Sequence, residues 1–189
     1  AGTPLISDPG YKLVLMAIEE NLSIIPIPGP SAVTASLVGS GISTENFYFA
    51  GFLPSKENKK INTLKSLLKI NSLLIFFESP RRLKKTLQSM LSIFGDRKCV
   101  VLRELTKYYE TFYRGKISKI CLDIKLEKNI KGEITIIIDK PYKENSKNIV
   151  NNIENQNLEK IFSFAKGKIS TKNLATLLSI IYKKPKKVF

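Results

Sequence analysis

Two clusters of charged side chains have the composition needed to act on an anionic substrate. Glu78-Ser79-Pro80-Arg81-Arg82 and Arg103-Glu104-Leu105-Thr106-Lys107 each follow an apolar run typical of a buried strand. The chain contains 26 Lys but only five Arg, and three of those five lie in these clusters. A guanidinium group binds a phosphate through two parallel hydrogen bonds. We therefore expect Arg81, Arg82, Arg103 and Lys107 to contact phosphate groups of an anionic partner.

The carboxylates of the same clusters are the candidates for proton transfer. The chain has no His, so a general base would be a carboxylate, a lysine or water, and we expect Glu78 or Glu104 in this role. A Glu that pairs with a neighbouring Arg has a lowered pKa, which makes it a weak base. The alternative for both clusters is a network of Arg–Glu pairs that only holds the two loops.

Two loops rich in Gly and Pro suggest a ligand pocket. One contains Gly2-Thr3-Pro4; the other is Pro28-Gly29-Pro30-Ser31-Ala32, between a strand-type run and a helical segment. Gly lets a backbone approach a ligand closely, Pro fixes the loop's shape, and N–H groups at a helix start favour anionic or polar ligands. Neither loop fits the dinucleotide or Walker A pattern. Ordinary βα turns without a ligand are the alternative.

The elements that must position these residues follow from the apolar periodicity. Strands alternate with helices, which predicts an α/β fold. Both charged clusters follow buried strands, so we expect them at the same edge of one sheet. We expect helices over 8–21, 31–39, 64–68, 80–94, 116–126, 158–165 and 171–182, and strands over 23–27, 47–51, 73–77, 99–102, 108–114 (an edge strand) and 133–138 (a closing strand).

Charge divides the chain into segments. The net charge is +15, but residues 1–50 carry one basic against four acidic residues, 51–140 carry 20 against 9, and 141–189 carry 10 against 3. A basic segment suits a polyanionic partner. The alternative is that a Lys-rich composition explains the whole excess of charge, although it does not explain the uneven distribution. We predict four segments: part of a first α/β domain over 1–46, a second α/β domain over 47–140, a polar linker over 141–157 and a basic helical tail over 158–189.

Several classes of protein are excluded by composition. Without His and with two separated Cys, the chain has almost no ligand set for zinc or haem, so we expect no metal. No apolar run approaches the roughly 18 residues that span a bilayer, so we expect no membrane partner and a cytoplasmic location. The chain begins on Ala1 inside a loop, and we interpret it as the C-terminal part of a longer protein.

Six short motifs occur in order over residues 1 to about 140. They are 1–10 (AGTPLISDPG), 26–32 (PIPGPSA), 51–54 (GFLP), 77–83 (FESPRRL), 103–107 (RELTK) and 132–133 (GE). Together they resemble the tetrapyrrole methylase superfamily, and the first two resemble elements found throughout it. The Glu-Ser-Pro and Arg-Glu-Leu-Thr-Lys motifs resemble, within it, the family of small-subunit ribosomal RNA methyltransferase I.

The resemblance implies a two-domain tetrapyrrole-methylase-like α/β enzyme that works as a homodimer and binds S-adenosylmethionine in the cleft between its domains. It implies 2′-O-methylation of a cytidine ribose in the decoding region of 16S rRNA within the small ribosomal subunit. The N-terminal strand and glycine-containing loop that open the family's first domain are missing here. By position in the motifs, the cofactor contacts would be Gly2, Thr3, Pro4, Ser31, Ala32, Phe77, Glu78 and Gly132.

Two other functions stay open. An enzyme of the same fold could methylate a small tetrapyrrole, although the basic second domain argues against this substrate. The chain could also be a fragment that binds RNA without catalysis. RNA binding that weakens steeply with salt would distinguish the first alternative, and a melting temperature that rises with S-adenosylmethionine would argue against the second.

Overall fold

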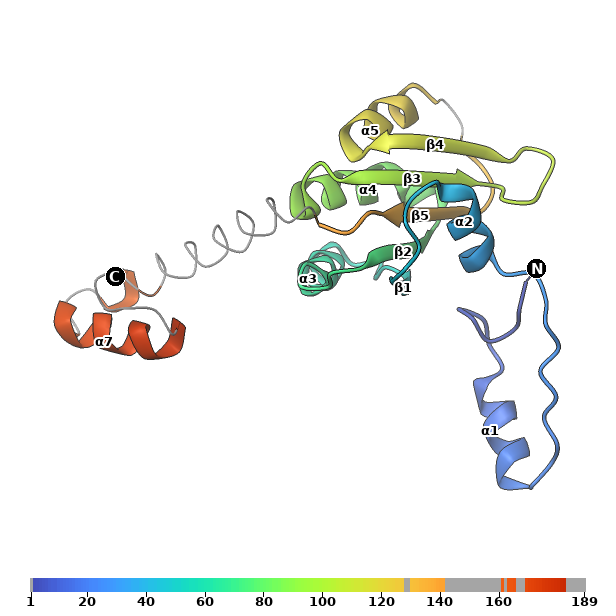
Figure 1. The fold of residues 1–189 in the computed structure, drawn as a ribbon, viewed down its shortest axis with the longest axis horizontal. Coiled ribbons are helices and arrows are strands. Elements are labelled where there is room, and N and C mark those ends of the chain that lie inside the picture. Colours follow the sequence, from blue (N-terminus) through green and yellow to red (C-terminus); the bar gives the residue numbers. More distant parts are fainter. Residues whose placement is uncertain (1, 128–129, 142–160, 162, 166–168, 183–189) are drawn as a thin grey trace. The chain divides into compact units, whose positions relative to one another are not determined.

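The computed structural model describes residues 2–127, 130–141, 161, 163–165 and 169–182 (Figure 1). The chain forms two compact units, Ala1–Pro141 and Tyr142–Phe189, which are described separately. The first unit contains the sheet and the candidate site. The domain boundary that the sequence places near residue 46 stays a prediction.

One five-stranded sheet forms the centre of the first unit (Figure 1). Its strands lie in the order β1 (Phe47–Phe52), β2 (Leu73–Glu78), β5 (Ile134–Ile138), β3 (Lys98–Arg103) and β4 (Thr111–Lys116). β1 pairs with β2 in parallel, whereas β5 runs antiparallel to both β2 and β3.

The strand directions bring the two charged clusters to one edge of the sheet. β2 and β3 are both antiparallel to β5, so they run in the same direction and end at the same edge, as the sequence predicted. In register, Glu78 and Arg103 both lie opposite Ile134, at the start of β5. β5 is therefore a central strand and not the closing strand that we expected. All five of its residues are buried, as is usual for a strand covered on both faces.

Helices cover both faces of the sheet (Figure 1). On one face lie α3 (Glu57–Leu67), α4 (Pro80–Phe94) and α5 (Ile117–Leu126), which share an apolar core with β2, β3 and β5. The helix α2 (Ala32–Ser40) packs Val33 and Leu37 against the other face. The sheet is thus the middle layer of three.

Local sequence explains the strongest of these helices. In α4, Pro80 occupies the first helical turn and Gly95 follows the last residue. Leu83, Leu87 and Phe94 recur at helical spacing, and all three are buried in the core.

α2 is fixed to the sheet by a close approach at Gly39. A Cβ on Gly39 would lie 2.8 Å from Cε1 of Phe112, so a larger residue would push α2 off β4. Arg114 donates a 2.6 Å hydrogen bond from Nη2 to the Gly39 carbonyl. These contacts fix the position of α2 on the sheet, and therefore the position of its N-terminus at the candidate site.

The segment before α2 differs from the prediction. The buried strand expected at residues 23–27 is wrong: this stretch has no regular structure, and Ile25 and Ile27 are 77% and 81% exposed. Pro26 within it, and Pro28 and Pro30 directly after it, lack the N–H donors of a ladder, and no strand of the five-stranded sheet pairs with this stretch. The helix α1 (Tyr11–Glu19) forms where expected but starts after Gly10, and none of its residues is buried.

The second unit contains the helix α7 (Thr171–Tyr182). The predicted cap is confirmed, because the Asn173 N–H donates to the Ser170 hydroxyl at 3.3 Å. Leu174 and Leu178 are buried with Ala165. The predicted linker from residue 142 onward, half of the predicted 158–165 helix and the terminal lysines lie outside the described residues. In the described part of the chain, no helix has the length and hydropathy that crossing a bilayer requires.

Candidate functional site

A cavity of about 520 Å³ opens at the edge where β1 and β2 end and β5 begins. Of the eight residues predicted as cofactor contacts, Pro4 alone does not line it. Four segments that are distant in the sequence converge there: 2–8, 31–32, 77–80 and 132–135. The seven predicted residues that line this cavity, called the larger cavity below because a smaller one adjoins it, are Gly2, Thr3, Ser31, Ala32, Phe77, Glu78 and Gly132.

The two Gly/Pro loops lie against each other at this cavity, as the sequence led us to expect. Thr3 donates two hydrogen bonds to the Pro30 carbonyl, from its backbone N–H at 2.8 Å and from its hydroxyl at 3.0 Å. Gly2 has a φ of +137°, in a region that L side chains rarely adopt. Ser31 is the N-cap residue of α2, yet its side chain makes no capping hydrogen bond. Ser31 and Ala32 line the cavity, so the start of α2 and a hydroxyl not used for capping are present there as hydrogen-bonding groups.

Aromatic side chains form another wall of the larger cavity. Phe52 and Phe77 both line it, and their rings meet edge to face with centroids 5.6 Å apart. Phe49 supports Phe77 from β1 in the same manner, at 4.9 Å. Phe52 is 56% exposed, so one aromatic face is available to a ligand. The cavity thus combines aromatic surface with hydroxyl and backbone polar groups, which suits a ligand that is part flat ring and part polar chain.

Glu78 is buried, and its carboxylate is already occupied. Oε1 accepts a hydrogen bond from the Ser79 N–H at 2.8 Å and lies 3.2 Å from Nε of Arg82. Oε2 accepts a 2.6 Å hydrogen bond from the Thr86 hydroxyl. These three donors hold the carboxylate at the N-terminus of α4. The geometry favours a positioning role for Glu78 over proton transfer, because few of its lone pairs face the cavity.

The adjacent arginines Arg81 and Arg82 have different surroundings. Besides Glu78, Arg82 bonds the chain before α3, donating from Nη2 to the carbonyls of Leu53 at 2.7 Å and Pro54 at 3.1 Å. Arg81 is exposed, and no hydrogen bond or ion pair of its side chain occurs among the described residues. Arg82 therefore fixes the position of the β1–α3 connection, whereas the Arg81 guanidinium is available to a partner.

The second charged cluster forms an ion-pair network across the sheet edge. Nζ of Lys107 lies 2.9 Å from Oε1 of Glu104 and 3.0 Å from Oε2 of Glu133. The Glu133 N–H donates to the same Glu104 oxygen at 2.8 Å. The Glu133 N–H and then the Lys107 ammonium lower the pKa of Glu104, and Glu104 followed by Glu133 raises the pKa of Lys107. From the sequence, the alternative to a phosphate-binding role was a network of Arg–Glu pairs that only holds the loops. The second cluster does form such a network, but its cation is Lys107 and not an arginine.

A smaller cavity of about 240 Å³ adjoins the larger one and shares Gly132 with it. Gly132 has a φ of +94°, and a Cβ there would overlap the Glu104 carboxylate, so this position requires Gly. Nε of Arg103 is buried and has no hydrogen-bond partner among the described residues. This donor lacks an acceptor that the described residues could supply. The smaller cavity is lined by Arg103, Glu104, Tyr109, Lys131 and Gly132.

Several residues that line the two cavities were missed by the sequence reasoning, among them Phe52, Tyr109 and Lys131. Phe52 belongs to the 51–54 motif, so that motif could have identified it. Tyr109 and Lys131 belong to none of the six motifs, and in so Lys-rich a chain one lysine is not distinctive. Within the described residues, no group of three His, Cys, Asp or Glu side chains could hold a metal ion.

Comparison with known proteins gives a consistent family. The family model of tetrapyrrole (corrin/porphyrin) methylases matches residues 1–121. The ribosomal RNA small subunit methyltransferase I of Halalkalibacterium halodurans is 46% identical over 74% of this chain and 48% of its own length. The protein of the same name from Thermotoga maritima is 44% identical over 73% of this chain and 61% of its own. The chain spans about half the length of the curated relatives it matches.

Solved structures share the fold at low sequence identity. Diphthine synthase aligns with a TM-score of 0.57 at 12% identity, over 80% of this chain and 62% of its own. The uroporphyrin-III C-methyltransferase of Thermus thermophilus, solved with S-adenosyl homocysteine, aligns with a TM-score of 0.51 at 15% identity, over 72% and 62%. At these identities the likeness shows the fold alone, which agrees with the predicted α/β class.

Proposed function

The chain belongs to the tetrapyrrole methylase family, and from this premise we propose that it is part of an S-adenosylmethionine-dependent methyltransferase that acts on ribosomal RNA of the small subunit. The observation that carries the proposal is the convergence of segments 2–8, 31–32, 77–80 and 132–135 on one cavity. Relatives that are 38–46% identical are named for this activity.

The larger cavity suits S-adenosylmethionine in size and in chemistry. Its volume of about 520 Å³ lies within the roughly 300–1,000 Å³ of small-molecule sites. Gly2 brings backbone close to the ligand, the Ser31 hydroxyl offers a hydrogen bond, the Thr3 hydroxyl can still accept one, and Phe77 offers a ring face or edge. Ala32, Glu78 and Gly132 complete the proposed contacts, and Pro4 shapes the loop without reaching the cavity. Bound there, S-adenosylmethionine would supply an electrophilic methyl group on a sulfonium.

The chain's own contributions are then positioning, exclusion of water and proton removal. We propose that the acceptor is the 2′-hydroxyl of a cytidine in the decoding region of 16S rRNA, held at the smaller cavity. Glu104 borders this cavity and, with its lowered pKa, stays ionised at neutral pH. It is thus suited to accept the hydroxyl's hydrogen bond and orient it. Glu78 is the weaker candidate, because three donors occupy its carboxylate.

The charge of the chain supports an RNA substrate over a small tetrapyrrole. Residues 51–140 carry 20 basic against 9 acidic side chains. We propose that Arg81 contacts a phosphate directly, because its exposed guanidinium makes no hydrogen bond or ion pair among the described residues, and that Arg103 binds a phosphate at the smaller cavity, which it lines. Arg82 and Lys107 act on the RNA chiefly by fixing the loops that carry their neighbours. We also propose a homodimer acting on the small subunit in the cytoplasm.

Titration calorimetry with S-adenosylmethionine, followed by transfer of a tritiated methyl group to unmethylated small subunits, tests this function. We expect binding that S-adenosylhomocysteine blocks, and a product in which the phosphodiester bond 3′ to one ribose resists alkaline hydrolysis. Because the chain spans about half the length of its relatives, transfer is compared with a version extended at its N-terminus. No cofactor binding by either version would refute the proposal. Sedimentation of the extended version tests the dimer.

A further inference from the structure

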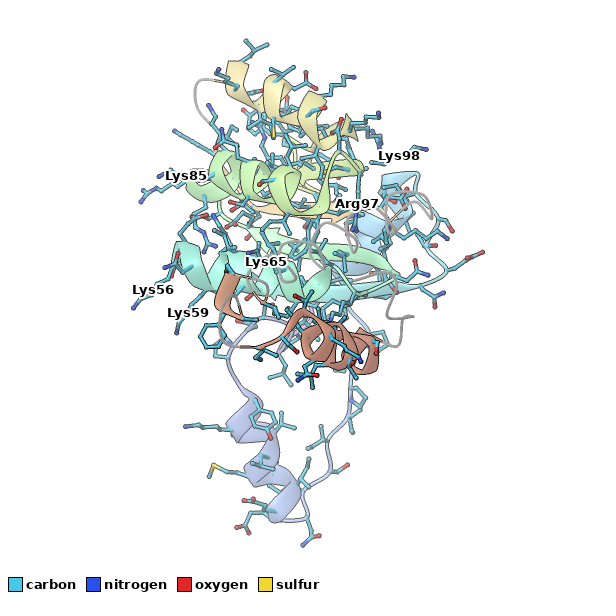
Figure 2. All side chains as sticks on the ribbon, turned by 90° about the vertical axis from the view of Figure 1, so that its left-hand side faces the viewer. Lys56, Lys59, Lys65, Lys85, Arg97 and Lys98 are labelled. Atoms are coloured by element: carbon cyan, nitrogen blue, oxygen red, sulfur yellow. The ribbon has the colours of Figure 1, made fainter. Side chains whose placement is uncertain are left out.

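The outer surface of α3 and α4 is strongly basic. Residues 54–98 carry 11 basic against 3 acidic side chains, and α4 contains no acid. Figure 2 shows Lys56 and Lys59 at the start of α3 and Lys85 on α4, all pointing away from the body on the same side. We call Lys56, Lys59 and Lys85 the lysine face. Arg97, also labelled, is not part of it, since its side chain is buried beside the Phe94 ring.

No carboxylate forms an ion pair with the lysine face in the described structure, although Glu57 is near enough to Lys85 for the Lys85 charge to contribute to lowering the pKa of Glu57. The single acid of α3, Glu57, lies 2.9 Å from Nζ of the buried Lys60 and accepts a 3.1 Å hydrogen bond from Ser89 on α4. The hydrogen bond from Lys60 is the main cause of the lowered pKa of Glu57. Glu57 is therefore committed to joining α3 to α4. No ion pair of the three face lysines occurs among the described residues.

The same surface lacks apolar anchors. Large hydrophobic side chains are exposed elsewhere in the described chain, but none lies between residues 57 and 94. Protein partners are usually held by buried aromatic or aliphatic anchors, and membrane-surface helices insert apolar side chains. A partner of the lysine face would be held by charge and hydrogen bonds alone. The phosphate backbone of a nucleic acid is such a partner.

The lysine face also lies close to the sheet edge that carries the candidate site. α3 follows β1 and α4 follows β2, so both helices start at the edge where the larger cavity opens. Arg82 ties these two starts together through the carbonyls of Leu53 and Pro54. Lys59 lies within the first turn of α3, and Lys85 lies five residues after the start of α4. An RNA strand that reaches the cavity would pass within reach of these lysines.

We propose that the lysine face is a second RNA-binding surface, which binds the phosphates next to the methylated nucleotide without reading their sequence. This inference rests on the proposed function, because it takes the RNA substrate as given. Lysine suits such contacts, because its ammonium is a point charge on a flexible stem and does not need one fixed phosphate geometry. The lysine face contributes affinity and register along the strand, whereas choice of nucleotide belongs to the cavities.

The test compares two triple variants of the full chain that remove equal charge. Lys56→Gln/Lys59→Gln/Lys85→Gln alters the lysine face, and Lys116→Gln/Lys119→Gln/Lys125→Gln removes three exposed lysines from β4 and α5. Binding to an unmethylated 16S rRNA fragment that spans the decoding region, and to an unrelated RNA of equal length, is measured over a range of KCl concentrations.

We expect the face variant to bind both RNAs at least 10-fold more weakly at low salt. Its plot of log affinity against log salt should be shallower by up to about 2, because each neutralised phosphate of a single strand contributes roughly 0.7. The control variant should change affinity less than 3-fold. A third variant with Arg at the three face positions should retain the wild-type slope, and all variants should bind S-adenosylmethionine equally.

The inference is wrong if both Gln variants lose RNA affinity equally, or if the salt slope of the face variant is unchanged. It is also wrong if the face variant loses binding to phosphatidylserine vesicles but keeps its binding to RNA. The proposed function fails separately. A wild-type chain that binds RNA through the lysine face, but whose extended version neither binds S-adenosylmethionine nor transfers methyl groups, would refute the enzyme and support the surface.

Discussion

Arg82 offers the sharpest test of how the candidate site is held together. Its guanidinium joins three acceptors: the Leu53 carbonyl at 2.7 Å, the Pro54 carbonyl at 3.1 Å and the buried Glu78 carboxylate at 3.2 Å. The variant Arg82→Ala removes all three contacts together. Glu78 is 3% exposed and would lose its cationic partner while it stays buried. The neighbour Arg81, exposed and without such contacts in the described chain, provides the matched control Arg81→Ala.

The expected loss can be worked from these contacts. A hydrogen bond that involves a charged group contributes about 1.5 kcal/mol or more, and removing the partner of a buried charge costs up to about 5 kcal/mol. The Arg82 side chain is 31% exposed, so water replaces part of what is lost. We therefore expect Arg82→Ala to lower the free energy of unfolding by about 3 kcal/mol. Arg81→Ala should lower it by less than about 0.5 kcal/mol.

Urea unfolding followed by circular dichroism measures this difference. With a slope of about 2 kcal/mol per molar urea, Arg82→Ala should shift the midpoint down by about 1.5 M without changing the slope. The same variant should weaken S-adenosylmethionine binding, because the residues before α3 support the Phe52 wall. A loss below about 1 kcal/mol, or an equal loss in Arg81→Ala, would refute the positioning role of Arg82.

Three further predictions concern single residues. Gly132→Ala should reduce S-adenosylmethionine affinity at least 10-fold by calorimetry, because the added Cβ would displace the Glu104 side chain. Gly41 also has a positive φ but has open space around it, so the control Gly41→Ala should leave the affinity unchanged. The pKa of Glu104 is lowered below 4.5 in the fold, so the stability that its ionised carboxylate contributes is present above that pH and is lost on acidification. The melting temperature of Glu104→Gln should therefore fall less than that of wild type below about pH 4.5, and parallel curves of melting temperature against pH would contradict this. Burial raises the pKa of both thiols, and Cys99 is fully enclosed, so a thiol reagent should label Cys121 slowly and Cys99 only after unfolding; fast labelling of Cys99 would be inconsistent with the core.

The elements of the sheet could be predicted because each carries its own local signals. β2 is a continuous apolar run, and α4 has a Pro at its start, a Gly at its end and a helical apolar stripe. The order of the strands could not be predicted in the same way. That β5 lies between β2 and β3 depends on pairing between residues distant in the chain. The strand expected at 23–27 failed for the same reason, because an apolar run cannot show whether a neighbour exists to pair with it.

The site was predicted as a set of positions but not as a set of contacts. The Gly/Pro loops and the ends of β2 and β3 do meet at one edge, since that follows from strand direction and motif order. Which cations are free does not follow from sequence. Arg81 and Arg82 differ by one residue, about 100° around α4, and that rotation turns one to solvent and the other to internal carbonyls.

The central claim is that the convergence of the four segments makes a site for S-adenosylmethionine. Ultraviolet cross-linking with methyl-labelled S-adenosylmethionine, followed by peptide mapping, tests it most directly. The label should appear in peptides that contain residues 2–8, 31–32, 77–80 or 132–135, and excess S-adenosylhomocysteine should remove it. Label that resists this competition, or that is confined to peptides away from the cavity such as 117–126, would contradict the claim.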